Sequence, residues 1–357
     1  MYGIILPRQK AQKGLDTLKK MGLLEREFEF KRTERGIEVP LIREPSDVET
    51  NTLRLEIGYF ELRQAEFQPA LSRPKKLQEI IEVPRELVSK LPSSFDIIGD
   101  IAIVEIHADL ASFSSEIGKA ILEINPHVRL VIKKSGEVTG TFRTREFQRV
   151  AGSGTTETVY YEFSCRYKLD VATVYFNPRL SHERMRVAQQ VKRDELVVDM
   201  FAGVGPYSIL IAKSQPTSRI FSIDINPIAV GFLKQNAFEN SVADRVIPLL
   251  GDARNLSMKE VHTVADRVVM NLPSEAANFI DVAIRTLRKE GGRLHFYQFI
   301  QRDTPIDSVK NSFRSIVEAN NGNVESFEFC NVIREISPGM VQVAIDAVVT
   351  KDSSLRG

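Results

Sequence analysis

Residues 195–206 read ELVVDMFAGVGP, and this stretch decides the fold. Its first half is an apolar run typical of a strand that is buried on both faces. Gly203 and Gly205 follow at once, where a backbone without Cβ atoms can turn tightly and pass close to a ligand. Further apolar runs alternate with helical segments and lie at 219–224, 245–250, 265–270 and 292–299. This alternation predicts an α/β fold with a doubly wound, mainly parallel sheet covered by helices on both faces.

Polar residues follow the successive strands. Asp224 and Ile225 end the second strand, Asp252 and Ala253 follow the third, and residues 271–274 (NLPS) follow the fourth. Because open α/β sheets bind ligands at the carboxyl ends of their strands, we expect these residues to share one site. Asp224 can accept hydrogen bonds from ribose hydroxyls, and Asp252 can read an adenine amino group. Each element by itself is an ordinary turn with a capping side chain; together, at four successive strand ends, they predict a cofactor site.

The main competing ligand is a nicotinamide dinucleotide. Its fingerprint G-x-G-x-x-G would place a third glycine at position 208, where this chain has Ser208. The block D-x-F-x-G-x-G at 199–205 instead resembles class I S-adenosylmethionine methyltransferases. This resemblance implies a Rossmann-like catalytic domain with S-adenosylmethionine as cofactor. The cofactor residues that it implies are Asp199, Phe201, Gly203, Gly205, Asp224, Ile225, Asp252, Ala253, Asn271 and Pro273.

The pattern predicts three domains. Residues 1–68 form a small α/β domain, with a helix over 8–24, strands at 27–32 and 36–42, and a short helix after residue 45. A proline-containing linker covers 69–82. Residues 83–170 form a mostly β middle domain and residues 171–357 the catalytic domain. The remaining expected elements are strands at 96–106, 128–133, 140–150 and 159–169, a helix at 114–124, and an antiparallel pair at 324–331 and 341–349.

Composition limits the partners and the compartment. The 357 residues carry a net charge of +1, so a polyanion would have to be held by local basic patches. The two cysteines, Cys165 and Cys330, match no metal spacing, and two isolated thiols suit a reducing compartment. No apolar run approaches the roughly 18 residues that a membrane span needs. We therefore expect a cytoplasmic protein without a metal and without a membrane segment. We also expect a monomer, although composition does not determine the oligomeric state.

A more specific resemblance rests on several blocks in order. They are LPSSFDIIGDIA at 91–102, FRTRE at 142–146, YFNPRLSHER at 175–184, the cofactor block at 199–205, and NLPS at 271–274. Together they look like the archaeal and eukaryotic tRNA (guanine-37-N1)-methyltransferases, over nearly the whole chain. The resemblance implies tRNA as partner, methylation of the guanosine next to the anticodon, and tRNA recognition by the N-terminal domain.

The family's chemistry assigns roles to individual residues. Guanine N1 carries a proton at neutral pH, so a base must remove it, and charge that builds on O6 needs a donor. The resemblance implies Glu183 as the base and Arg145 as the O6 donor, with Arg143 as the other match, because an arginine fork reads a carbonyl-bearing base edge. Asn271 would orient the base and Tyr175 would pack against it. Further substrate-binding residues are Pro178, Arg179 and Ser274.

Three alternative functions stay open at this stage. Some archaeal relatives also methylate a tricyclic wyosine-pathway guanosine, 4-demethylwyosine, and the motifs do not separate the two activities. A related enzyme transfers the aminocarboxypropyl group of the same cofactor, but its signature differs from residues 178–184. The chain could also be a non-catalytic RNA-binding protein with a vestigial cofactor fold.

Overall fold

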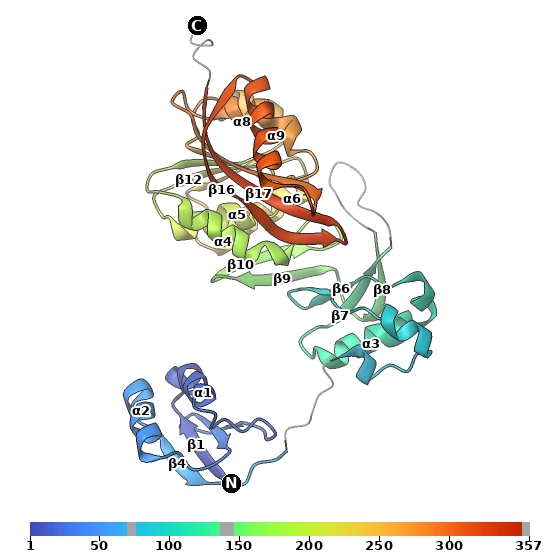
Figure 1. Ribbon diagram of the computed structural model, residues 1–357, viewed down its shortest axis with the longest axis vertical. Helices are drawn as coiled ribbons and strands as arrows, with labels where there is room; N and C mark the ends of the chain where they lie inside the picture. The colour runs from blue at the N-terminus through green and yellow to red at the C-terminus, as the bar shows by residue number, and fades with distance from the viewer. Residues whose placement is uncertain (70–75, 136–145, 352–357) are drawn as a thin grey trace. The chain divides into compact units, whose positions relative to one another are not determined.

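The computed structural model describes residues 1–69, 76–135 and 146–351 of the chain. It divides into two compact units, Met1–Glu79 and Ile80–Gly357, and each unit is described by itself (Figure 1). The domain boundaries expected within the second unit stay predictions. None of the helices in the described residues is long and apolar enough to cross a membrane.

The first unit is a four-stranded antiparallel sheet with two helices. Its strand order is β2-β3-β1-β4, and α1 packs beside α2. The expected strand at 27–32 was too long, since only Lys31 and Arg32 pair with the neighbouring strand. The central strand β1 was not predicted, because its apolar run has no alternation that separates a strand from a helix. The elements are β1 (Tyr2–Leu6), α1 (Ala11–Lys20), β2 (Lys31–Arg32), β3 (Ile37–Leu41), α2 (Asp47–Ile57) and β4 (Glu61–Gln64).

The second unit begins with a sheet of order β5-β6-β7-β8 whose strands β7 and β8 are covered by α3. The single strand expected at 96–106 is in fact a hairpin that turns at Gly99 and Asp100. Gly99 has a φ of +59°, and a Cβ atom there would lie 2.1 Å from the Thr158 hydroxyl oxygen, so the turn requires glycine. The elements are β5 (Asp96–Ile98), β6 (Ile101–Val104), α3 (Ser114–Ile124), β7 (Leu130–Lys134) and β8 (Phe147–Gly152).

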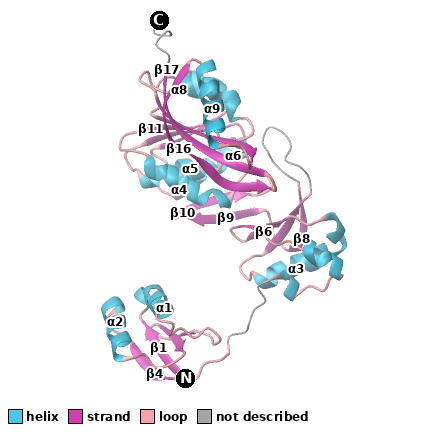
Figure 2. Cartoon of the chain, viewed as in Figure 1, coloured by secondary structure: helices cyan, strands magenta, loops and turns pink. Residues whose placement is uncertain are grey.

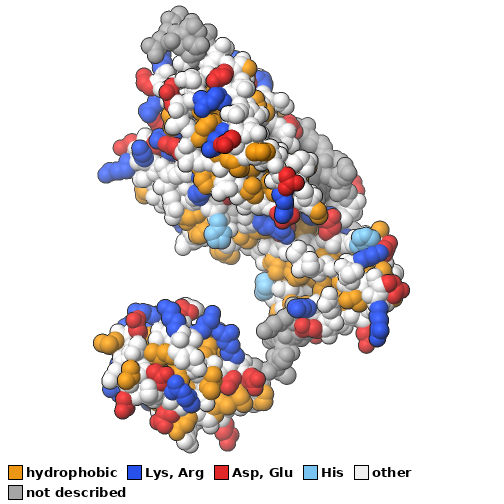
Figure 3. Space-filling view, in the orientation of Figure 1, with side chains coloured by type: hydrophobic (Ala, Val, Ile, Leu, Met, Phe, Trp, Pro, Cys, Tyr) orange, Lys and Arg blue, Asp and Glu red, His pale blue; other side chains and the backbone are white. Residues whose placement is uncertain are grey.

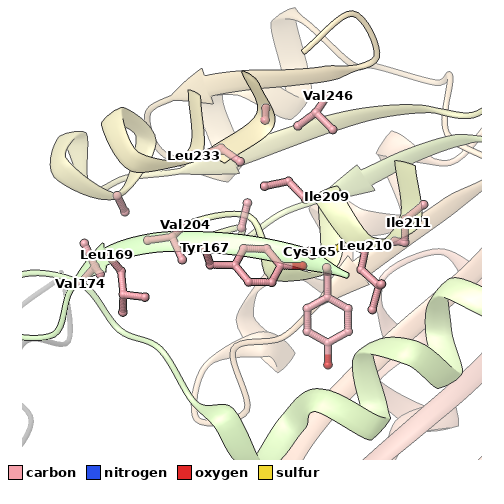
Figure 4. Close-up of a cluster of buried hydrophobic side chains, with 14 of the residues drawn as sticks. Cys165, Tyr167, Leu169, Val174, Val204, Ile209, Leu210, Ile211, Leu233 and Val246 are labelled. Atoms are coloured by element: carbon pink, nitrogen blue, oxygen red, sulfur yellow. The ribbon is translucent and has the colours of Figure 1, made fainter. Parts of the chain in front are cut away.

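A second hairpin, β9 (Glu157–Glu162) and β10 (Cys165–Asp170), also replaces one expected strand. Its turn residues, Phe163 and Ser164, both have positive φ, which matches the twist of a tight hairpin. Tyr167 and Leu169 of β10 pack into the same core as Ile209 and Leu233 (Figure 4). The hairpin therefore packs against two helices of the following seven-stranded sheet, through Ile209 and Leu233.

The seven-stranded sheet has the order β13-β12-β11-β14-β15-β17-β16. Strands β11 to β15 are parallel, and the final antiparallel pair adds β17 between β15 and β16, so the predicted fold class is confirmed. Alternate residues face opposite layers: Val197 joins the core under α4, α5 and α6, and Val198 joins the core under α7, α8 and α9. Figure 2 shows α4 and α5 on one side of the sheet and α8 and α9 on the other.

The bounds of these elements follow the chain. The strands are β11 (Leu196–Asp199), β12 (Arg219–Asp224), β13 (Val246–Leu250), β14 (Arg267–Met270), β15 (Gly292–Gln301), β16 (Gly322–Ser337) and β17 (Met340–Lys351). The helices are α4 (Ser181–Gln190), α5 (Pro206–Ser214), α6 (Pro227–Glu239), α7 (Ala253–Lys259), α8 (Ile280–Thr286) and α9 (Ile306–Ala319).

A buried ion pair joins α4 to the β9–β10 hairpin. Arg184 is 1% exposed, and its Nε and Nη2 atoms donate to the two carboxylate oxygens of Glu162 at 2.6 and 2.5 Å. Its Nη1 atom donates to the Asn177 carbonyl oxygen at 3.0 Å. Charges removed from water are tolerated only when each is paired, so both partners depend on this geometry.

We expect Arg184→Met to lower the free energy of unfolding by about 3–5 kcal/mol, because the Glu162 charge would be left buried without its partner. Urea unfolding measures this change. The control is Lys168→Met on the same hairpin, whose half-exposed pair with Glu157 at 3.3 Å predicts a loss of about 0–1 kcal/mol. Equal small losses in both variants would contradict the structural role of the buried pair.

Candidate functional site

One cavity of about 1140 Å³ brings most of the predicted site residues together. It lies at the carboxyl ends of β11 to β14 and is closed on another side by β5, β6 and β17. The predicted residues that line it are Tyr175, Arg179, Phe201, Gly203, Asp224, Ile225, Asp252, Ala253, Asn271, Pro273 and Ser274.

Asp224 is held rigidly at the cavity wall. Its Oδ2 atom accepts the backbone N–H of Gly203 at 2.6 Å, and its Oδ1 atom accepts the backbone N–H of Asn226 at 2.9 Å. Burial raises the pKa of the carboxyl group, and these backbone hydrogen bonds oppose the rise. Gly203 has a φ of +55°, which favours glycine and brings its N–H to the carboxylate. The two strand ends are thus joined around a carboxylate that keeps free lone pairs.

Two predicted cofactor residues lie behind the cavity rather than in its wall. Asp199 is fully buried, and its Oδ2 atom accepts the Ser208 hydroxyl at 2.8 Å. Burial raises the pKa of Asp199 to about 7. A Cβ atom on Gly205 would lie 2.3 Å from Leu233 Cδ1, so this glycine is needed for packing against α6. Both residues support the turn that carries Gly203.

Asn271 presents an unused acceptor to the cavity. Its Oδ1 atom is buried and has no hydrogen-bond partner within the described part of the chain. Buried polar atoms are almost always paired, so an orphaned oxygen in a cavity wall indicates a donor on the ligand. The glycine turn, the free lone pairs of Asp224 and this oxygen fit a nucleoside cofactor and a hydrogen-bonding base.

Glu183 lies outside the cavity lining and is 7% exposed. Arg186 clamps it, donating Nε to Oε2 at 2.8 Å and Nη2 to Oε1 at 2.7 Å, and the Tyr297 hydroxyl donates to Oε1 at 2.7 Å. Arg186 Nη2 also donates to Asp346 Oδ1 at 3.0 Å. Leu180, three residues before Glu183 in the chain, lines the cavity.

The other predicted substrate residues have mixed outcomes. Arg179 lines the cavity and pairs with Asp96 of β5 at 2.6 Å. Pro178 begins the 3-10 turn Pro178–Leu180 and does not line the cavity. Arg143 and Arg145 lie outside the described residues.

Among the cavity residues that sequence reasoning missed are Asp96, Phe299, Arg334 and Gln342. Asp96 lies in a block quoted for the family resemblance, which was its signal. The other three come from β15, β16 and β17, where no motif marks them. Across the described ranges, no group of acidic, histidine or cysteine side chains could hold a metal ion.

The raised pKa of Asp199 predicts a pH dependence of stability. Its pKa is about 7 in the folded chain and about 4 in the unfolded chain, so folding favours the protonated form. The unfolded state therefore loses this proton first, and stability should fall as the pH rises from about 4 to 7. Asp199→Asn has no such proton to lose. Its free energy of unfolding, taken relative to that of the native protein, should therefore rise by roughly a few kcal/mol between pH 5 and pH 8. Urea unfolding at several pH values measures the difference, and parallel curves would contradict it.

Cofactor affinity tests the role of Asp224. Asp224→Ala removes the expected ribose acceptor, and losing hydrogen bonds to a charged group should weaken S-adenosylmethionine binding about 10- to 100-fold. Calorimetry measures the affinity. Asp244→Ala is the control, because Asp244 is exposed and pairs with Arg245 away from the cavity. Unchanged affinity in Asp224→Ala would remove this residue from the site.

Two family models match the chain. The model of the TRM5/TYW2 methyltransferase domain matches residues 158–325, and that of the TYW2 N-terminal domain matches residues 77–155. The chain is 39% identical over 326 residues to the tRNA (guanine(37)-N(1))-methyltransferase Trm5b of Pyrococcus abyssi, covering 91% of this chain and 92% of the relative. It is 31% identical over 278 residues to a tRNA(Phe) (4-demethylwyosine(37)-C(7)) aminocarboxypropyltransferase of Pyrococcus horikoshii, covering 77% and 97%.

Solved structures agree with these relatives. The crystal structure of Trm5b from Pyrococcus abyssi matches with a TM-score of 0.71 and 37% identity, over 98% of this chain and 99% of the other. The complex of aTrm5 with tRNALeu matches with a TM-score of 0.67 and 30% identity, over the same shares. The extensive identity and the shared fold confirm the predicted resemblance: the chain belongs to the TRM5/TYW2 family of methyltransferases.

Proposed function

We propose that this protein transfers a methyl group from S-adenosylmethionine to N1 of guanosine 37 in tRNA. The observation that carries the proposal is the cavity, which combines a ribose-binding carboxylate at Asp224 with an unpaired acceptor at Asn271. Support also comes from the 39% identity to an archaeal tRNA (guanine(37)-N(1))-methyltransferase across 91% of the chain.

The residues of the strand ends would hold the cofactor. Asp224 keeps lone pairs for ribose hydroxyls because each of its oxygens has accepted a backbone N–H and can accept a further donor. Ile225, Asp252 and Ala253 would border the adenine, and Pro273 would stiffen the turn beside the reacting atoms. When bound, S-adenosylmethionine supplies an electrophilic methyl group on a sulfonium.

The acceptor half of the cavity lies around Asn271 and Tyr175. Guanine carries N–H donors at N1 and N2, which suit the unpaired Asn271 oxygen. Target bases in an anticodon loop must leave their stack to be reached, and Tyr175, half-exposed at the cavity, offers a ring for the base to pack on. Arg179 and Ser274 complete the proposed base pocket with Pro178 behind them, and Arg145 or Arg143 is the proposed O6 donor.

Glu183 is the proposed base for the N1 proton. Three donors fix the position of its two oxygens, one from Tyr297 and two from Arg186, and the turn that contains Leu180, three residues earlier in the chain, lines the cavity. A carboxylate positioned in this way can remove a proton from a base seated against that turn.

We expect Glu183→Gln to slow single-turnover methyl transfer by about 10²- to 10⁴-fold, because the amide cannot take the N1 proton. Affinities for cofactor and tRNA should stay unchanged, and raising the pH should partly restore the rate as guanine N1 ionises without help. The control is Asp346→Asn, which removes the other carboxylate partner of Arg186. If both variants lose the same fraction of the rate, Glu183 acts only through the charge network.

Mass mapping of nucleosides tests the function itself. Unmodified tRNA and its isolated anticodon stem-loop are incubated with the enzyme and S-adenosylmethionine, with guanosine or adenosine at position 37. We expect one methyl group on N1 of guanosine 37. Addition of an aminocarboxypropyl mass would assign the alternative activity, and no cofactor binding would leave an RNA-binding protein.

The N-terminal unit is the proposed recognition domain for tRNA. Its helix α1 exposes Lys13, Lys19 and Lys20, and Figure 3 shows Lys and Arg side chains spread over this unit. Such groups can contact phosphates, and phosphate contacts position a protein on nucleic acid. Whole tRNA should therefore be a better substrate than the stem-loop. Methylation of 4-demethylwyosine, the monomeric state and the cytoplasmic location stay predictions.

A further inference from the structure

Arg334 of β16 and Gln342 of β17 are cavity residues on strands that no motif marks. They are opposite each other in the ladder, and Arg334 Nε donates to Gln342 Oε1 at 2.6 Å. Because an arginine side chain has donors and no acceptor, this contact fixes the orientation of the amide. The Nε2 atom of Gln342 is therefore the group that stays available.

That amide nitrogen has no use within the protein. Gln342 is 0% exposed, and its Nε2 atom finds no acceptor among the residues that the structure describes. A buried donor without a partner carries a desolvation penalty and is rare in folded proteins. Because the residue also lines the cavity, its unused N–H indicates an acceptor atom on the ligand.

The backbone of β16 is irregular where it meets the cavity. Its register against β17 shifts between Val332 and Arg334 and again between Glu335 and Ser337. The three consecutive residues Arg334, Glu335 and Ile336 all line the cavity, which the alternation of a regular strand would not allow. Bulges of this kind re-aim side chains beside active sites.

The position in the sheet separates Gln342 from the cofactor half of the cavity. Strand β17 lies four strands from β12, whose end carries Asp224, or about 19 Å at about 4.8 Å a strand. It lies two strands from β14, whose end carries Asn271, or about 10 Å by the same spacing. Arg334 also interacts with Tyr175, the proposed stacking residue. The unused N–H therefore belongs to the acceptor half.

We propose that Gln342, oriented by Arg334, is a substrate-binding residue that donates a hydrogen bond to the target purine. The acceptor on the base is O6 or N7 of guanine, the atoms that it presents on one edge. Adenine would present its 6-amino donor where guanine has O6, so an O6 contact would also reject adenine. This inference rests on the proposed methylation of guanosine in tRNA.

Substitution of Gln342 tests the inference. Gln342→Met keeps the volume and removes the donor, and kcat/KM for tRNA with guanosine 37 should fall about 5- to 100-fold, as when a buried partner is lost. The kcat/KM of Gln342→Glu should be lower still, because its carboxylate can pair with Arg334 but offers only acceptors to the base. S-adenosylmethionine affinity should stay unchanged in both variants, and urea unfolding checks that both are folded.

Gln215→Met is the matched control. Gln215 is a half-buried amide that donates to the Val191 carbonyl oxygen at 3.2 Å and does not line the cavity. Its kcat/KM should equal that of the native enzyme.

A modified substrate distinguishes the two acceptor atoms. If the contact is to N7, the native enzyme should have a lower kcat/KM with 7-deazaguanosine at position 37 than with guanosine. Gln342→Met, which already lacks the contact, should then have the same kcat/KM with both. An O6 contact is kept in 7-deazaguanosine. It therefore predicts that Gln342→Met lowers kcat/KM by the same factor on the analogue as on guanosine. Native kcat/KM in Gln342→Met, or an equal loss of cofactor affinity, would overturn the inference. A native enzyme that yields no methylated guanosine would instead overturn the proposed function.

Discussion

Five parallel strands buried on both faces leave only their ends to meet a ligand, and the rest of the site depends on this constraint. Val197 and Val198 pack into opposite cores, and the first polar side chain of β11 is that of its last residue, Asp199. The polar groups must therefore gather at the edge, where Gly203 and Asp224 join two strand ends by one hydrogen bond. The geometry of the cavity follows from the order of the strands more than from any single side chain.

The antiparallel extension of the sheet carries charge into the interior instead of excluding it. His295 Nδ1 lies 2.7 Å from Asp346 Oδ1, and its Nε2 lies 2.7 Å from Arg267 Nη1. Because arginine only donates, Nε2 must accept, which leaves the ring proton on Nδ1 facing Asp346. Burial lowers the pKa of His295 and would raise that of Asp346, but His295 and Arg186 hold the Asp346 pKa below its usual range. The chain of pairs connects β15 and β17 to α4 and fixes Glu183 in place.

Much of this architecture follows from local sequence. The strand at 219–224 and the helix at 114–124 have the predicted bounds, because each has a strong period and clear polar limits. The prediction of one strand at 96–106 was wrong because DIIGDIAIVEI is mostly apolar on both sides of the turn, and only Gly99 and Asp100 mark that turn. The cofactor edge was predictable because its residues follow strands in order. Arg334 and Gln342 were not, since their meeting depends on a bulge and on a ladder between segments that carry no motif.

Asn236 of α6 and Asn240, the residue that caps the C-terminus of α6, take the place of a missing strand beside β10. Asn236 exchanges hydrogen bonds with the backbone N–H and C=O of Lys168 at 2.8 and 3.0 Å, and Asn240 does the same with Arg166 at 2.9 and 2.6 Å. Four residues of helix rise about 6 Å and two residues of strand about 6.7 Å, so one helical turn matches one repeat of the strand edge. A side-chain amide copies the peptide group, and the outer edge of β10 is saturated where it would otherwise template the strand of another molecule. A single-residue insertion in α6 between these asparagines would break the match and expose an edge prone to intermolecular β-pairing.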